Sequence, residues 1–209
     1  MQPEDFIRAN AVPLSPPLVP EIALYLASEV VPLWRKTEEE LAQTGVPPPY
    51  WAFAWAGGQA LARYILDNPS WVAGKTVLDI GSGSGLVGLA AAKAGASNVL
   101  AADIDAFACA AIGLNARTNN LRITTTQENL IGADGDWDVI LVGDLFYERP
   151  LAERLLAWLR VMDKPALLGD PGRTYFPKQG VEKLAAYNVQ TTRDLEDREI
   201  RETGAYRLI

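Results

Sequence analysis

The stretch T-V-L-D-I-G-S-G-S-G-L-V-G, residues 76–88, decides the fold that this sequence predicts. It opens with a short β-branched and apolar run, which is typical of a buried strand, and continues into glycines spaced for a tight turn. A helical segment rich in alanine, residues 85–95, follows at once. A strand, a glycine turn and a helix in this order are the first unit of a parallel sheet covered by helices.

From residue 75 onward, strand and helix patterns alternate. Strands are expected at residues 76–80, 98–103, 122–126, 138–143, 165–169, 189–193 and 205–209, and helices at 57–67, 85–95, 106–120, 149–162 and 181–188. We therefore predict an α/β fold with a doubly wound, mostly parallel seven-stranded sheet and helices on both faces. The last two strands have no helix between them after residue 193, so we expect an antiparallel hairpin at the sheet edge.

The first 49 residues are expected to form an N-terminal arm with helices, and residues 50–209 to form the sheet domain. Four prolines within residues 1–18 predict an irregular start. The segment E-I-A-L-Y-L-A-S-E-V, residues 21–30, is predicted to be a helix. Residues 37–45 are predicted to form a second short helix with a capping box at its start.

Composition excludes several kinds of site. The 209 residues carry 26 acidic and 19 basic side chains, a formal charge of −7, which opposes binding along a nucleic-acid backbone. The chain has no histidine, which excludes a Ser-His-Asp triad and a His-based zinc site, and no metal site is expected.

Composition also bears on where the protein works. Cys109 is the single cysteine, which favours a reducing compartment. No apolar run approaches the ~20 residues of a membrane span. Residues 1–10 lack the pattern of a secretory signal. We expect a cytoplasmic monomer with no membrane partner.

Two acids point to the ligand of the glycine turn. Residues 83–88 match the Gly-x-Gly-x-x-Gly pattern of dinucleotide sites, but Asp79 precedes the turn and would repel a diphosphate. An acid there suits a cation, and S-adenosylmethionine carries both a sulfonium and an ammonium. Asp103 ends the next strand, where it can accept the ribose hydroxyls of either ligand, and Asp105 competes for this role. Residues 128–130 fall where an adenine edge could be read.

At this point residues 50–209 resemble a class I, seven-stranded S-adenosylmethionine-dependent methyltransferase. Four segments, residues 49–66, 77–96, 138–150 and 169–176, are similar to protein lysine methyltransferases of this kind. Their nearest resemblance is to the electron transfer flavoprotein beta-subunit lysine methyltransferase family. The resemblance implies S-adenosyl-L-methionine as cofactor, S-adenosyl-L-homocysteine as product, and a lysine of the electron transfer flavoprotein beta subunit as methyl acceptor.

The resemblance also implies roles for single residues. Asp79 and residues 81–85 correspond to the first cofactor motif, and Asp103 to the acid that binds the ribose. Residues 144–147 correspond to a motif that borders the methyl acceptor. The candidate cofactor-binding residues are Trp51, Trp55, Asp79, Gly81, Ser82, Gly83, Gly85, Asp103, Ile104, Asn129, Leu130 and Asp144.

An aromatic segment precedes the first predicted helix of the sheet domain. By the resemblance, residues 51–58 cover the cofactor, although Ala56 stands where relatives often have proline. If the segment is extended, the rings of Trp51, Phe53 and Trp55 share one face. They then either shield the cofactor or serve as ordinary core aromatics beneath the N-terminal arm.

The sequence G-D-L-F-Y, residues 143–147, places an acid and two aromatic rings at the end of the fourth strand. With a lysine as acceptor, Asp144 can attract and orient the ammonium, and Phe146 or Tyr147 can stack on it. These three residues are the candidate catalytic residues. Alternatively, the two rings cover the core, and Asp144 caps the helix that begins near Pro150.

Three classes of function stay open at this point. The first is a protein-lysine N-methyltransferase, and the second is a small-molecule N-methyltransferase with the same cofactor site. The third is a cofactor-binding module without turnover, against which the presence of Asp79, Asp103 and Asp144 argues.

Overall fold

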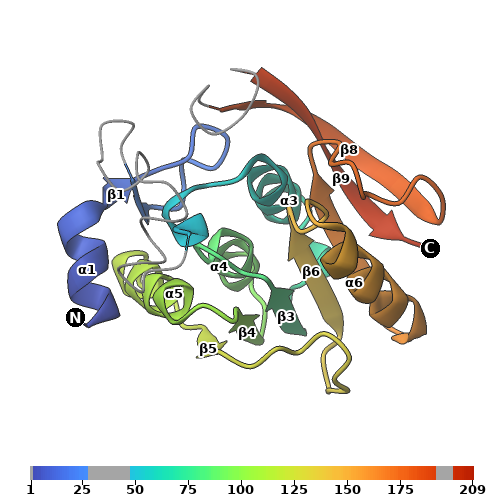
Figure 1. Ribbon diagram of the computed structural model, residues 1–209, viewed down its shortest axis with the longest axis horizontal. Coiled ribbons are helices and arrows are strands. Elements are labelled where there is room, and N and C mark those ends of the chain that lie inside the picture. The colour runs from blue at the N-terminus through green and yellow to red at the C-terminus, as the bar shows by residue number, and fades with distance from the viewer. Residues whose placement is uncertain (1, 28–47, 192–199) are drawn as a thin grey trace.

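The computed structural model describes residues 2–27, 48–191 and 200–209, and it is built on a seven-stranded sheet in the order β5-β4-β3-β6-β7-β9-β8 (Figure 1). The strands of this sheet are β3 (Thr76–Ile80), β4 (Asn98–Ala102), β5 (Thr124–Thr126), β6 (Val139–Gly143), β7 (Ala166–Asp170), β8 (Val181–Gln190) and β9 (Ile200–Leu208). Neighbouring strands are parallel from β5 through β4, β3 and β6 to β7, whereas β9 is antiparallel to its neighbours β7 and β8. The predicted doubly wound, mostly parallel fold is confirmed.

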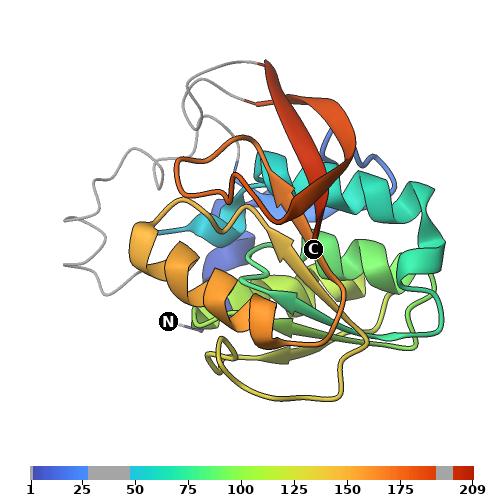
Figure 2. The same cartoon turned by 90° about the vertical axis from the view of Figure 1, so that its right-hand side faces the viewer.

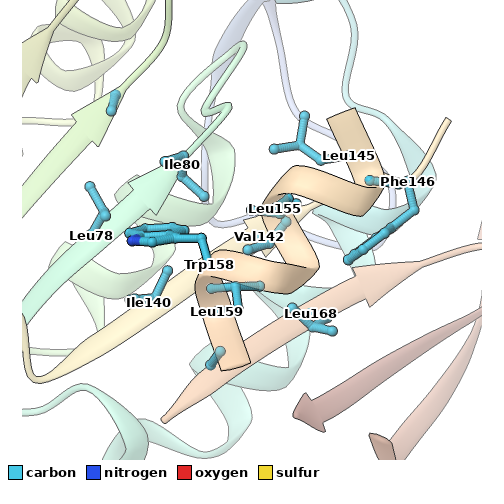
Figure 3. Packing of buried hydrophobic residues seen from close by; sticks show 13 residues of the cluster. Leu78, Ile80, Ile140, Val142, Leu145, Phe146, Leu155, Trp158, Leu159 and Leu168 are labelled. Carbon is cyan, nitrogen blue, oxygen red and sulfur yellow. The ribbon is translucent and has the colours of Figure 1, made fainter. Parts of the chain in front are cut away.

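Helices cover both faces of the sheet (Figure 2). They are α3 (Ala56–Asp67), α4 (Leu86–Lys93), α5 (Ala106–Thr118) and α6 (Arg149–Val161), with the 3-10 turns η1 (Tyr50–Ala52) and η2 (Pro69–Trp71). Side chains alternate along β3, so that Val77 packs with α3 and α4 while Leu78 packs with α6. Figure 3 shows Trp158 of α6 over the face of the sheet that carries Leu78 and Ile140. No helix in the described ranges is long and apolar enough to cross a membrane.

The prediction of a helix over residues 181–188 is wrong, because these residues belong to β8. The segment contains glutamate, lysine, leucine and alanine, which favour helix in isolation. Pairing with β9, from Val181 opposite Leu208 to Gln190 opposite Ile200, overrides that preference. The predicted antiparallel hairpin at the sheet edge is confirmed, with a longer first strand than expected.

The N-terminal predictions are also wrong where the structure describes them. Residues 3–10 form α1 (Pro3–Asn10), and its proline is tolerated because it stands in the first turn. The strands β1 (Val12–Leu14) and β2 (Leu24–Leu26) pair antiparallel, so residues 24–26 are not helical. Burial of Ile22, Leu24 and Leu26 follows the strand period of two. The second predicted helix, residues 37–45, lies outside the described residues.

Two asparagines, Asn115 in α5 and Asn119 at its C-cap, connect the N-terminal segment to the sheet domain. The Asn115 Oδ1 atom accepts the Tyr25 N–H at 2.7 Å, and its Nδ2 atom donates to the Ser84 carbonyl oxygen at 2.8 Å. Asn119 exchanges hydrogen bonds with the main chain of Ala23. The N-terminal segment is therefore fixed to the helix that packs against the glycine turn.

The first turn of α3 touches the end of β7 with no side chain between them. A Cβ atom at Gly57 would collide with the carbonyl oxygen of Gly169, and a Cβ atom at Gly169 would collide with that of Gly57. Only glycine at both positions permits this approach.

Replacing Gly57 with alanine is expected to destabilise the fold by about 1–3 kcal/mol, the usual cost of forcing an extra methyl group into a packed site. Gly58→Ala is the matched control, because a Cβ there meets Val87 as its nearest neighbour at 3.8 Å. Alanine gains up to about 1 kcal/mol over glycine inside a helix. Urea unfolding measures both variants, and equal stabilities would contradict the close contact.

Candidate active site

A pocket of about 700 Å³ lies at the carboxyl ends of β3, β4 and β6. Its walls come from the turns after these strands, from the segment around η1, from residues 127–131 and from the start of α6. Ligands of doubly wound sheets bind at this edge, and pockets of 300–1,000 Å³ take molecules of cofactor size.

The glycine turn forms the floor of the pocket. Gly81 and Gly83 line it, and both have positive φ angles of 62° and 54°. A Cβ atom at Gly81 would collide with Leu145, so glycine is needed for packing as well as for conformation. Gly85 lies at the N-cap of α4 and is not among the lining residues.

Asp79 lies beneath the turn and not in the pocket wall. Its side chain is buried, with 1% of its surface exposed. One carboxylate oxygen accepts hydrogen bonds from the Ser82 hydroxyl and, at 2.8 Å, from the Gly88 N–H. Burial raises the pKa of Asp79 to about 7, although these two hydrogen bonds oppose the shift. Asp79 and Ser82 therefore hold the turn in shape from below.

Asp103 lines the pocket beside the turn. Its Oδ2 atom accepts the Gly83 N–H at 2.8 Å, and its Oδ1 atom accepts the Asp105 N–H at 3.0 Å. Burial raises the pKa of Asp103 above its ordinary value. Asp105 also lines the pocket, but its Oδ1 atom caps α5 through the Phe107 N–H at 2.8 Å. Both acids therefore line the pocket, and both also accept main-chain N–H groups.

The wall next to Asp103 is formed by Ile104, Asn129 and Leu130. Ile104 is exposed over 69% of its surface. The Asn129 Oδ1 atom accepts the Ile131 N–H at 3.1 Å, so this side chain also shapes its own turn. Gln127 and Glu128 line the same stretch, so this part of the wall offers apolar contact and a polar edge to a flat heterocyclic group.

Asp144 stands at the junction of three elements. Its Oδ1 atom accepts from Arg173 Nε at 2.6 Å, and its Oδ2 atom accepts the Gly57 N–H at 2.9 Å. The Asp144 N–H donates to the Gly169 carbonyl oxygen at 2.9 Å, and the residue has a positive φ of 63°. The alternative that Asp144 caps α6 is wrong, because Glu148 holds the N-cap position.

The two aromatic residues after Asp144 point to different places. Phe146 is fully buried, and its ring meets Phe176 edge-on at a centroid distance of 5.3 Å, in the core beside α6 (Figure 3). Tyr147 lines the pocket and is 40% exposed. Burial raises the pKa of Tyr147 to about 12, with Tyr50 as the next largest cause, so its phenol stays uncharged. Only Tyr147 of this pair reaches the pocket.

The aromatic segment is not extended throughout, so the expectation that its three rings share one face is wrong. The 3-10 turn η1 separates them: Trp51 and Trp55 line the pocket, whereas Phe53 does not. Trp51 also packs in the core with α1 and α5, as the alternative of a core aromatic expects.

Tyr50 was not predicted. Its ring lies 6.1 Å from that of Trp55 and 6.0 Å from that of Tyr147. The sequence signal that could have identified Tyr50 is its position directly before Trp51 in the aromatic segment.

Comparisons with known proteins agree with this geometry. A family model described as ribosomal protein L11 methyltransferase (PrmA) matches residues 60–145. The chain is 44% identical over 197 residues to the electron transfer flavoprotein beta subunit lysine methyltransferase of Xenopus laevis, covering 90% of this chain and 79% of that protein. The human protein of the same name is 40% identical over 184 residues, covering 85% and 69%.

Solved structures share the fold. The ribosomal protein L11 methylase of Lactobacillus delbrueckii subsp. bulgaricus has a TM-score of 0.50 at 23% identity and covers 70% of this chain and 75% of that one. The Pyrococcus abyssi tRNA (uracil-54, C5)-methyltransferase, in complex with S-adenosyl-L-homocysteine, has a TM-score of 0.52 at 20% identity and covers 70% and 38%.

Fold, pocket and curated relatives together place the chain among the class I methyltransferases, enzymes that take a methyl group from S-adenosylmethionine. More narrowly, the chain belongs to the family of electron transfer flavoprotein beta subunit lysine methyltransferases and is a protein-lysine methyltransferase.

The pocket fits S-adenosylmethionine. Its volume suits a nucleoside with an amino-acid tail, and the floor is open at Gly83, where a Cβ atom would meet no atom closer than 4.0 Å. The four acidic residues in its wall, Asp103, Asp105, Glu128 and Asp144, suit hydroxyl and cationic partners. The buried Trp51 indole N–H has no hydrogen-bond partner within the described part of the chain, which leaves a donor beside the pocket.

The stability of the ligand-free enzyme is expected to fall as the pH rises through the range set by Asp79. The folded pKa of about 7 exceeds the ordinary 3.8, so the folded state holds the proton more tightly and loses stability between these values. Asp79→Asn cannot ionise, and it should gain roughly 1 kcal/mol or more over the wild type between about pH 5 and about pH 8.

Chemical unfolding across this pH range makes the measurement. Asp138→Asn is the matched control, because hydrogen bonds from Thr76 lower the pKa of this exposed carboxyl and keep it ionised throughout the range. If the stability gained by Asp79→Asn over the wild type does not change with pH, the raised pKa of the buried Asp79 is contradicted.

Proposed function

We propose that this enzyme transfers methyl groups from S-adenosylmethionine to a lysine of the electron transfer flavoprotein beta subunit. The observation that carries the proposal is the 44% identity to a relative named for this activity, over 79% of that relative's length. The position of Asp144 and Tyr147 in the wall of the cofactor pocket supports it, because an acid and an aromatic ring suit a cationic side chain.

In this proposal each part of the cofactor meets its own group of residues. Asp103 accepts the ribose hydroxyls, Ile104 and Leu130 enclose the adenine, and Asn129 reads its edge. Gly81 and Gly83 allow the floor to approach the aminoacyl part, while Asp79, Ser82 and Gly85 act by shaping the turn. Trp51 and Trp55 cover the bound molecule. When bound, the cofactor supplies a methyl group on a sulfonium, which is electrophilic enough to need no further activation.

The acceptor half has to orient the lysine and release its proton. A free lysine has a pKa of about 10.4 and is charged at neutral pH, so it has no lone pair until that proton leaves. The Asp144 carboxylate orients the ammonium, and the rings of Tyr147 and Tyr50 face its aliphatic and cationic end. Exclusion of water and alignment of the nitrogen supply most of the acceleration. Phe146 contributes from the core, by fixing the turn that presents Tyr147.

We infer further that the enzyme is a monomer that works in a reducing compartment such as the cytoplasm. The support is the single cysteine of the sequence. Light scattering that finds a dimer, or fractionation that finds the protein outside the cytoplasm, would contradict these two points.

The substrate assignment is tested with purified electron transfer flavoprotein, labelled S-adenosylmethionine and the enzyme. We expect label on lysine of the beta subunit, located by mass spectrometry of its peptides. A preparation in which Asp103 is replaced by alanine serves as the control for cofactor-dependent labelling. Label that appears only on low-mass metabolites would instead favour a small-molecule N-methyltransferase.

Asp144→Asn is expected to lower kcat by about 100-fold or more while cofactor affinity changes by less than about threefold. The amide keeps an acceptor for the Gly57 N–H but loses the charge that orients the ammonium. Single-turnover assays measure the first quantity and calorimetry the second. Retained turnover would remove Asp144 from the acceptor site.

A further inference from the structure

Arg173 holds the Asp144 carboxylate from the side of β7. The Nε atom of Arg173 lies 2.6 Å from Asp144 Oδ1, and both residues line the pocket. The pair is largely shielded from water, with 19% of the Arg173 side chain and 2% of the Asp144 side chain exposed. An ion pair in such a place interacts more strongly than one at the surface.

The turn that carries Arg173 is itself fixed by a buried acid. The Asp170 Oδ1 atom accepts the N–H groups of Gly172 at 2.7 Å and of Arg173 at 2.8 Å. Asp170 is 1% exposed and not among the pocket-lining residues. The guanidinium position is thus determined at the main chain, by Asp170, and at the side chain, by Asp144.

Other charged and titratable groups surround this pair from each neighbouring element. They are Asp170 on β7, Arg201 on β9, Tyr50 in η1, Asp103 after β4, Tyr147 and Glu148 before α6, and Arg154 on α6. The Tyr147 phenol is uncharged at neutral pH, and Arg201 donates to the Pro171 carbonyl oxygen at 3.2 Å. Arg173 is the cation in direct contact with Asp144.

We propose that Arg173 is a positioning residue for methyl transfer: it fixes Asp144 at the acceptor site, and its charge favours the uncharged form of the acceptor lysine. The proposal rests on the function proposed above.

The reason lies in the competition of two cations for one carboxylate. An ammonium that approaches Asp144 also approaches the guanidinium. Two like charges in a shielded site repel each other, which disfavours the charged form of the group that gives up its proton more readily. Arginine keeps its proton under all ordinary conditions, whereas lysine can lose one. The lysine ammonium therefore releases a proton to water, and the amine that remains carries the lone pair required for attack on a methyl group.

The test is the pH profile of kcat with the flavoprotein beta subunit as substrate, because kcat reports groups in the enzyme–substrate complex. In the wild type, kcat should rise with pH to a plateau as the bound lysine loses its proton. In Arg173→Gln, whose amide N–H can still donate to Asp144, this limb should move upward by about one pH unit, so that kcat is about tenfold lower below the limb and close to the wild-type value on the plateau. Arg173→Lys keeps the charge and should keep the wild-type limb.

Two further variants separate other causes. Arg149→Gln removes an exposed guanidinium paired with Glu153 and should leave the profile unchanged. Burial raises the pKa of Asp170 to about 7, within the range measured, so Asp170→Asn tests whether that group makes the limb. Its amide oxygen still accepts the two N–H groups of the turn, and the limb should remain.

A uniform loss of kcat at every pH in Arg173→Gln would reduce the residue to a structural role and overturn the proposal. So would an equal limb shift in Arg173→Lys, or loss of the limb in Asp170→Asn. If the glutamine variant does not fold, Arg173→Met, which also removes the charge, takes its place with the same expected limb shift. Failure of the proposed function looks different, since the wild type itself would then add no methyl group to the beta subunit at any pH.

Discussion

The Asp144 carboxylate is the interaction on which the acceptor side of this enzyme depends. Asp144 directly follows β6, and its carboxylate accepts the first-turn N–H of Gly57 in α3 and pairs with Arg173 after β7. A buried charge of this kind is stable only when it is fully paired, and the N-terminus of α3 adds favourable polarity. The same bonds hold Asp144 at a positive φ that a residue with a Cβ adopts only when its surroundings impose it. The Gly57–Gly169 contact and the position of Asp144 therefore depend on each other, because Asp144 is hydrogen-bonded to both glycines.

The two acids near the glycine turn, Asp79 and Asp103, are held by hydrogen bonds to the main chain. Asp79 and Asp103 both accept N–H groups of the glycine turn or of the helix after it, one from below and one from the pocket wall. An acid before the turn was predicted to attract a cationic ligand directly. In the structure Asp79 is buried under the turn, so that any attraction it exerts acts through the loop it holds. Asp103, by contrast, lies in the pocket wall, where a ligand can contact it directly.

The family model covers only part of the pocket. The ribosomal protein L11 methyltransferase model matches residues 60–145, which contain the glycine turn, Asp103 and Asp144. Tyr50, Trp55, Tyr147 and Arg173 also line the pocket but lie outside this range. Part of the pocket is thus formed by consecutive strands and helices, and part by segments before and after them.

Local sequence determined the strand, turn and helix at residues 76–93, the parallel sheet and the position of the cofactor acids, because hydrophobic period, glycine spacing and strand ends are properties of neighbouring residues. Tertiary structure decided the rest. Residues 181–188 form a strand although their side chains favour helix, since pairing with β9 outweighs propensity. Phe146 and Tyr147 separate into core and pocket because the backbone of one turn sends adjacent side chains in different directions. Arg173 meets Asp144 across 29 positions of sequence because β6 and β7 are neighbours in the sheet, and no local pattern contains that distance.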